Sequence, residues 1–462
     1  MTTGWATLLE ATATEQARRI RAGEVSSRDL TRLYLDRIAR LNPALSAFVE
    51  TFEQRALFSA LRKDAARRRP RTAGALPPFD GVPIGIKDLN FVRLSRARFG
   101  MRGMGVWSPV DDRTVARLRA AGFVVLGKLA TSELGAMPVT EPDIHPPTRN
   151  PWDLRVSPGG SSGGSGAAVA GGLLPIAHGS DGAGSIRIPA ALCHLYGFKP
   201  SRGRVANAYG MSDRDILYTC GPLARSVEDA AAMLDALVGD ARGAGEASFA
   251  SQIDAKTGPL RVRLVVRNPI ATAHPEVRDA VLRTARTLES LGHHVVEADA
   301  PEVTLDEFLP IYQKLVSSPP GVRWSRVQPV TRWLGLAGKG LTRAHADAVQ
   351  QRLTARANEW FDGADVVLSP TVPGLAPAIG AFDGVDPATS FRQAAELGAY
   401  TAMFNVTGGP AATLPLAVSS GGLPIGVQLG AAPGDDLRVL QLSRQLERAL
   451  PWRGRRAPGV DW

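Results

Sequence analysis

Two turns rich in glycine and serine, together with one lysine upstream of them, could carry out nucleophilic chemistry. The first turn runs over residues 159–166 and the second over 179–185. The segment 167–176 between them is apolar and predicts a short buried helix that runs into a strand, so packed structure holds both turns. Glycines allow positive φ and a close approach of the backbone to a ligand, and consecutive N–H groups can then bind an anion.

A serine hydroxyl becomes a good nucleophile only when a base accepts its proton. The candidate base is Lys87, which follows a stretch where Val82, Ile84 and Ile86 alternate as in a half-buried strand. A lysine at a strand end is usually exposed. A lysine desolvated among apolar neighbours loses its proton more easily, however, and can then act as a neutral base. The two serine turns downstream favour this second interpretation.

Other catalytic arrangements fit the sequence less well. Residues 159–163 match the GxSxG nucleophile elbow of α/β-hydrolases, but that elbow needs a buried strand directly before it, and residues 150–158 are polar and contain two prolines. The seven histidines form neither an HExxH motif nor a cluster with cysteines. The chain also lacks a GxxxxGK[ST] phosphate loop. We therefore expect no metal site and no cofactor.

Three separated blocks resemble, in order and spacing, those of the amidase signature family of serine hydrolases. They are GIKD at 85–88, GGSSGG at 159–164 and GSDxxGSIRxPA at 179–190. The resemblance covers most of the chain and leaves about residues 230–360 without a recognisable motif.

The resemblance implies a catalytic role for three side chains. Ser185 would attack the substrate carbonyl, and Ser161, preceded by a cis peptide, would bridge Ser185 to Lys87. The 24 positions between the two serines (185 − 161) leave room for the helix and strand that bring the turns face to face.

The resemblance also implies an oxyanion hole and its supports. The hole would consist of backbone N–H groups in the second turn, those of Gly182, Ala183, Gly184 and Ser185. Ser162 and Asp181 would support this network, Asp181 by accepting hydrogen bonds that brace the turn. Ala183 stands where the family most often has glycine. Its methyl group requires a negative φ or strain, and we expect it to narrow the pocket.

The order of helices and strands predicts an α/β fold, a single domain with a central mixed β-sheet covered by helices on both faces. A helix over 113–121, closed by Gly122 and followed by an apolar strand over 123–126, is typical of such layered proteins. At the N-terminus we expect two helices, over 6–21 and 27–41. Because motifs flank the motif-poor middle on both sides, the whole chain, 1–462, forms one fold. Its expected parts are a helical region over about 1–70, a signature core over about 75–228, a variable substrate-pocket region over about 230–360 and the C-terminal part of the core over about 361–450.

The composition limits the partners and the compartment. The formal net charge is +10, but the arginines are scattered and no basic motif is interleaved with aromatic residues, so we expect neither nucleic acid nor a membrane as partner. Cys193 and Cys220 are too few for a disulfide framework. The chain has no secretory signal pattern and no apolar run of eighteen residues, which favours the cytoplasm. The only protein partner left open is a second copy of the chain.

The function expected from these observations is hydrolysis of a small carboxylic amide to an acid and ammonia or an amine, through an acyl-enzyme on Ser185. One alternative is the amidotransferase component of a tRNA-dependent complex, which shares the three motifs, but residues 320–360 show no tyrosine-rich stretch like that of such components. The other alternative is a catalytically silent family member. The joint presence of Lys87, Ser161 and Ser185 argues against it.

Overall fold

The computed structural model of the protein describes residues 3–68, 76–206, 217–239, 247–458 and 460. The boundary expected at about 70–75, between the helical N-terminal region and the core, lies outside the described residues.

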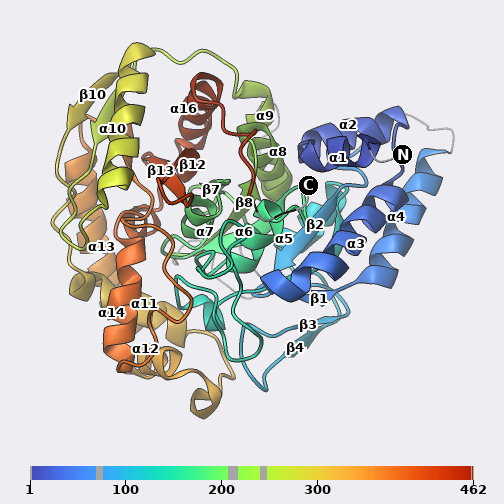
Figure 1. The fold of residues 1–462 in the computed structure, drawn as a ribbon. Coiled ribbons are helices and arrows are strands. Elements are labelled where there is room, and N and C mark those ends of the chain that lie inside the picture. The colour runs from blue at the N-terminus through green and yellow to red at the C-terminus, as the bar shows by residue number, and fades with distance from the viewer. Residues whose placement is uncertain (1–2, 69–75, 207–216, 240–246, 459, 461–462) are drawn as a thin grey trace.

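One mixed sheet of eleven strands runs through the centre of the molecule (Figure 1). The strands are β1 (Phe48–Thr51), β2 (Pro83–Lys87), β5 (Val124–Leu129), β6 (Ala177–Asp181), β7 (Tyr196–Lys199), β8 (Thr219–Ala224), β9 (Arg261–Leu264), β10 (His294–Glu297), β11 (Val366–Pro370), β12 (Ala411–Val418) and β13 (Pro424–Gly430). Their order across the sheet is β1-β5-β2-β6-β8-β7-β12-β13-β11-β9-β10. β3 (Ser95–Ala97) and β4 (Val106–Ser108) form a separate hairpin.

Helices cover both faces of this sheet. Tyr196 and Gly197 are neighbours on β7 and show opposite faces. A Cβ atom at Gly197 would lie 2.5 Å from Ala190 of α7 (Arg187–Leu192), whereas the Tyr196 hydroxyl bonds to Ser443 of α16 (Asp436–Ala449) at 3.1 Å. α6 (Gly163–Ala170) packs beside α7, and α8 (Val227–Val238) and α10 (Pro275–Ser290) pack beside α16. The predicted α/β fold, one domain with a covered mixed sheet, is confirmed.

The N-terminal helices lie at one edge of the sheet, drawn in blue in Figure 1. The expected helix over 6–21 is wrong in one respect, because the structure has α1 (Thr3–Glu10) and α2 (Ala13–Ala22) there. Thr12 separates them because its side chain caps α2 by accepting a hydrogen bond from the Glu15 backbone N–H at 3.1 Å. α3 (Ser27–Leu45), capped by Ser26, and α4 (Glu53–Arg67) follow.

β2 differs from the half-buried strand that its alternation predicts. All five of its residues are buried, because β2 lies between β5 and β6 in the interior of the sheet. Gly85 allows this close packing, since a Cβ atom there would lie 2.7 Å from Leu174 Cδ1. Lys87, the last residue of β2, is therefore placed inside the protein.

A layer of helices at the lower left of Figure 1 packs against residues of the second serine turn and the helix after it. It consists of α11 (Leu305–Ser317), α12 (Pro329–Lys339), α13 (Arg343–Phe361) and α14 (Pro387–Ala395). These helices bring Phe308, Tyr312, Leu353 and Phe391 into one apolar cluster with Ile188. The remaining helices are α5 (Arg113–Ala120), α9 (Phe249–Gln252) and α15 (Ala402–Thr407).

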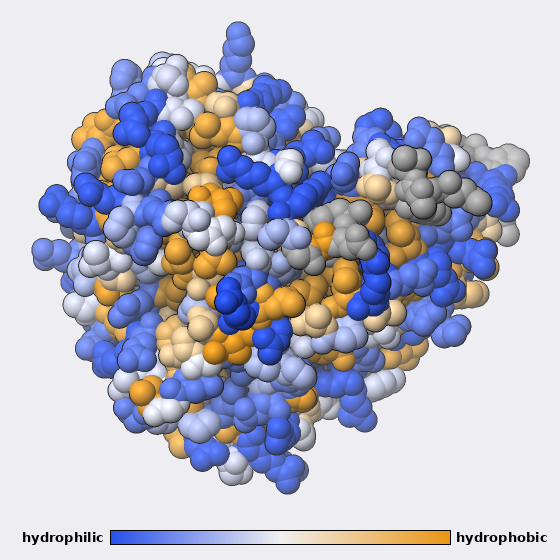
Figure 2. All heavy atoms as spheres, viewed as in Figure 1, coloured by the Kyte–Doolittle hydropathy of each residue, from blue (hydrophilic) through white to orange (hydrophobic). Residues whose placement is uncertain are grey.

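Neither the helices nor the surface of the described residues points to a membrane. In the described ranges, no helix combines the length and apolar character needed to cross a bilayer. Hydrophilic residues cover most of the periphery of the face in Figure 2, and hydrophobic residues gather mainly toward its middle.

Candidate active site

The two serine turns lie against each other and are joined through Ser162. Its backbone N–H donates to the carbonyl oxygen of Ser185 at 3.2 Å, and its hydroxyl donates to the carbonyl oxygen of Ser180 at 3.1 Å. α6 starts directly after this serine and is glycine-rich because the backbone of the neighbouring strand connection passes very close. A Cβ atom at Gly164 would lie 2.3 Å from the backbone nitrogen of Ala130. The helix therefore fixes the position of the first turn.

Lys87 and Ser161 form a buried hydrogen bond. The Lys87 Nζ donates to Ser161 Oγ at 2.7 Å, and it also approaches the carbonyl oxygen of Ser180 at 3.3 Å. The peptide bond between Gly160 and Ser161 is cis. Burial lowers the pKa of Lys87 to about 7, against a smaller opposing effect of Asp181 and Cys220. An appreciable fraction of the lysine is thus neutral near pH 7.

Ser185 stands at the boundary between this buried network and a cavity. It is 9% exposed and lines the cavity wall, whereas Ser161 is 2% exposed and Lys87 is fully buried. Among the described residues, Ser185 Oγ has no hydrogen-bond partner, and no hydrogen bond joins it to Ser161 Oγ. Of the three predicted catalytic side chains, Ser185 is therefore the one that a ligand in the cavity can reach.

Asp181 braces the second turn. Its carboxylate accepts hydrogen bonds from the backbone N–H groups of Gly184 at 2.7 Å and Ile186 at 3.1 Å, and it forms an ion pair with Arg187 at 2.9 Å. Burial alone would raise the pKa of Asp181, but the charge and hydrogen bonds of Arg187 hold this pKa well below its ordinary value. Asp181 is therefore an anion in the folded protein.

The predicted oxyanion hole needs one correction. The N–H of Gly184 is already bonded to Asp181 Oδ1, so it is not available to a substrate oxygen. The N–H groups of Gly182, Ala183 and Ser185 donate to no acceptor in the part of the chain that the structure describes. These three remain as candidate donors.

Ala183 fits its turn without backbone strain. Its φ is negative, and the positive φ of the turn, 131°, falls on Gly184. The methyl group of Ala183 lines the cavity and packs on the apolar cluster around Ile188. A glycine is required at 184 for a second reason, because a Cβ atom there would lie 2.3 Å from Thr401 Oγ1.

Sequence reasoning missed the buried network around Arg187. This guanidinium is fully buried and donates to the Thr401 carbonyl oxygen at 2.8 Å, to Gln428 Oε1 at 2.9 Å and to Asn405 Oδ1 at 2.6 Å. An arginine inside the apolar segment that follows the second turn is the signal that could have found it, since a buried guanidinium needs acceptors on all sides.

Lys128 and His178 offer no alternative base. Lys128 forms an ion pair with Asp88 at 2.8 Å and donates to the carbonyl oxygen of Asn90 at 2.6 Å. His178 is buried, and neither ring nitrogen has a hydrogen-bond partner among the described residues. Burial, and then the charges of Lys87 and Lys128, lower the pKa of His178 to about 3, so it is neutral at pH 7. Groups of three or more His, Cys, Asp or Glu side chains that could hold a metal do not occur in the described ranges.

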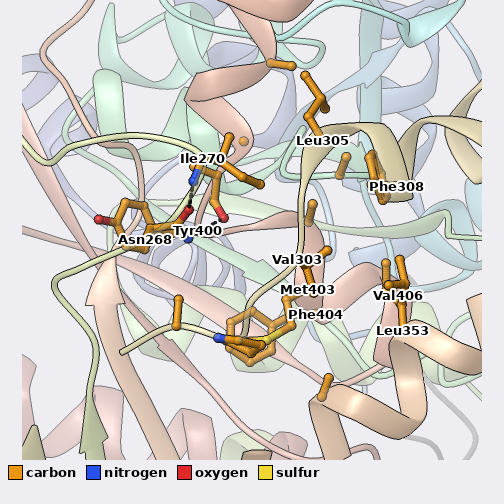
Figure 3. A pocket seen from close by; sticks show the side chains of 18 of the residues that line it. Asn268, Ile270, Val303, Leu305, Phe308, Leu353, Tyr400, Met403, Phe404 and Val406 are labelled. Carbon is orange, nitrogen blue, oxygen red and sulfur yellow. Dashed lines mark hydrogen bonds between the residues drawn. The ribbon is translucent and has the colours of Figure 1, made fainter. Parts of the chain in front are cut away.

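The cavity beside Ser185 has a volume of about 1140 Å³ including its open mouth. Its walls come from the stretches 136–138, 183–188, 265–270, 300–360, 367–369 and 391–406. Figure 3 shows that Asn268, Ile270 and Tyr400 lie on one side of it, while Leu305 and Phe308 lie on the other. A mostly apolar lining with a few polar groups is typical of sites that bind small organic ligands.

Comparisons with known proteins agree on one family. The family model described as "Amidase" matches residues 29–321 and 325–440. The 6-aminohexanoate-cyclic-dimer hydrolase of Paenarthrobacter ureafaciens is 38% identical, over 96% of this chain and 96% of its own. A solved structure of 6-aminohexanoate cyclic dimer hydrolase has a TM-score of 0.87 at 33% identity, covering 98% of this chain and 99% of the other. A glutamyl-tRNA(Gln) amidotransferase component from Thermotoga maritima has a TM-score of 0.76 at 26% identity, covering 98% and 99%. The chain belongs to the amidase family, the amidase signature enzymes, and is an enzyme that hydrolyses amide C–N bonds.

Proposed function

We propose that the protein cleaves a small carboxylic amide through an acyl-enzyme on Ser185, with Lys87 as base and Ser161 as proton bridge. The observation that carries the proposal is the buried 2.7 Å hydrogen bond from Lys87 Nζ to Ser161 Oγ, combined with a lysine pKa of about 7. A base with a pKa near the working pH transfers protons in both directions most effectively.

Acylation follows from these positions. Neutral Lys87 accepts the proton of Ser161 while Ser161 accepts that of Ser185, and Ser185 Oγ bonds to the carbonyl carbon. The N–H groups of Gly182, Ala183 and Ser185 stabilise the oxyanion. The C–N bond then breaks, and the leaving nitrogen receives the proton that Lys87 holds. Water attacks the acyl-enzyme by the reverse route, which releases the acid and regenerates Ser185.

The test uses the purified protein, treated with a chelator, on a simple amide with and without hydroxylamine. We expect release of ammonia or amine, diversion of the acyl group to the hydroxamate, and an adduct on Ser185 in the mass spectrum. Ser185→Ala should abolish turnover and leave the fold intact. Normal hydrolysis by this variant would refute the assignment.

The amidotransferase alternative differs in its requirements. It would show turnover of glutamine alone among amides, and only after partner proteins and charged tRNA are added. Activity of the isolated chain on several small amides supports the hydrolase instead. The lower identity to the Thermotoga maritima protein, 26% against 33% for the cyclic dimer hydrolase structure, also favours the hydrolase.

A further inference from the structure

The described lining of the cavity beside Ser185 has no side chain that carries a charge at neutral pH. In the described part of the chain, its lining contains no Asp, Glu, Lys, Arg or His side chain. Most of the wall is aliphatic or aromatic, and Figure 3 shows carbon-rich side chains such as Val303, Leu305, Phe308 and Met403 around the open space. A charged group inside this cavity would therefore find no counter-charge on the wall.

The polar side chains of the wall already make hydrogen bonds within the protein. Asn268 donates to the carbonyl oxygen of Ala399 at 3.0 Å and accepts from the Ile270 N–H at 2.8 Å. The hydroxyl of Tyr312 donates to the Ala136 carbonyl oxygen at 2.9 Å. The hydroxyl of Tyr400 donates to the Val266 carbonyl oxygen at 2.8 Å. Ser369 donates to the Pro370 carbonyl oxygen at 2.9 Å. The Ser185 hydroxyl, by contrast, has no hydrogen-bond partner among the described residues.

Aromatic rings form one side of the cavity near the serine turn. The ring centroids of Phe308 and Tyr312 lie 5.7 Å apart, and those of Tyr312 and Phe391 lie 5.6 Å apart. Ala183 and Ile188 complete this side next to Ser185. Such a surface favours alkyl or aryl groups, because these gain contact with the rings without giving up hydration.

We infer that the substrates are amides whose acyl group is uncharged and apolar, and that this acyl group occupies the cavity. The inference rests on the proposed function. A charged end group on the acyl chain would lose its hydration without gaining a counter-charge, and this loss lowers the binding of ground state and transition state alike.

The first experiment compares three amides with the same six-carbon acyl chain. They are hexanamide, 6-aminohexanamide and adipamic acid, and the readout is kcat/KM at pH 8 for the wild type. We expect kcat/KM to be at least about tenfold lower for each of the two charged amides than for hexanamide. Equal or better use of either charged amide would overturn the inference.

A second experiment introduces a counter-charge at Ile270, which is partly exposed and lies outside helices and strands. Ile270→Asp should raise the ratio of kcat/KM for 6-aminohexanamide over hexanamide at least about fivefold relative to its matched control, Ile270→Asn. An equal ratio in the two variants would mean that the acyl group lies elsewhere, which also overturns the inference.

Binding separates this inference from the proposed mechanism. Calorimetry on Ser185→Ala measures the affinity for the same three amides without turnover. If the wild type hydrolyses no amide while this variant still prefers hexanamide, the mechanism fails and the apolar ligand class stands. If Ser185→Ala binds the charged amides as tightly as hexanamide, the inference fails whatever the wild-type activity.

Discussion

At the scale of single residues, the protein places a lysine where water cannot reach it. Lys87 is fully buried, and its pKa is lowered to about 7 mainly by that burial. The same burial that costs the ammonium form its hydration makes the neutral amine available as a base. The position of one side chain at the end of β2 thus sets the pH range in which the proposed chemistry works.

The activity should depend on pH with a single step on the acid side. Because neutral Lys87 is the active form, kcat/KM should fall about tenfold per pH unit below about pH 7 and level off above it. Lys87→Ala should lower the acylation rate by about 10²–10⁴-fold and remove this step. Stopped-flow acylation rates from pH 5 to 9 provide the measurement. A variant with full activity and an unchanged profile would rule out the lysine as base.

Asp181 should matter for stability more than an exposed carboxylate does. Asp181→Asn leaves the buried Arg187 without its anion, and we expect the free energy of unfolding to fall by about 3–5 kcal/mol. The matched control is Asp347→Asn, whose partner Arg343 lies 2.7 Å away on an exposed helix face, with an expected loss below about 1 kcal/mol. Urea denaturation measures both. Equal losses would contradict the structural role of the buried pair.

At the scale of elements, the turns are positioned by helices that leave no space for larger residues. Gly164→Ala places a methyl group within 2.3 Å of the Ala130 backbone nitrogen, so α6 must shift away from β5. We expect a loss of about 1–3 kcal/mol or more in unfolding free energy, together with reduced activity. Gly258→Ala is the control, because a Cβ atom there meets nothing within 4 Å. Equal stability of the two variants would refute this packing argument.

Glu133 follows the end of β5 by four residues and forms a hydrogen bond with the residue before α12. Its carboxylate accepts a hydrogen bond from the Gln328 N–H at 2.7 Å, and burial raises its pKa from 4.5 to about 7. A carboxyl group with a raised pKa contributes stability that is complete below about pH 4.5 and is lost as the pH rises through about 7. Raising the pH from 5 to 8 should therefore lower the Tm of the wild type by about 1–3 °C more than it lowers the Tm of Glu133→Gln. Parallel Tm curves for the two proteins would contradict this.

The local sequence pattern predicts many of the helices and strands, and each wrong prediction has a physical cause. The helix over 113–121 and the strand after it appear as α5 and β5 because caps and apolar runs are local signals. The helix expected over 6–21 is divided into α1 and α2, because the Thr12 side chain caps the start of α2. β2 is buried on both faces because of its neighbours in the sheet, which its own alternation does not encode.

At the scale of the whole molecule, the sequence predicts the class of fold but not the order of its strands. β7 pairs with β12, whose residues lie more than two hundred positions later, and no local signal announces that pairing. The cavity is likewise assembled from six stretches of the chain, at 136–138, 183–188, 265–270, 300–360, 367–369 and 391–406, of which the sequence indicates only the second serine turn and those within 230–360. The serine and lysine residues were identifiable from their motifs, whereas the Arg187 network and the occupied Gly184 N–H required the folded backbone.

That Arg187 network also has a consequence for the protein during its synthesis. The guanidinium beside the second serine turn bonds to Asn405 and Gln428, which follow it by 218 and 241 positions. Until the ribosome has released Gln428, the nascent chain lacks these acceptors, and the turn that carries Ser185 has only its local support from Asp181. Translation must therefore be nearly complete before the enzyme is competent, and a fragment cut short before residue 405 would carry Lys87, Ser161 and Ser185 without the clamp that orders them.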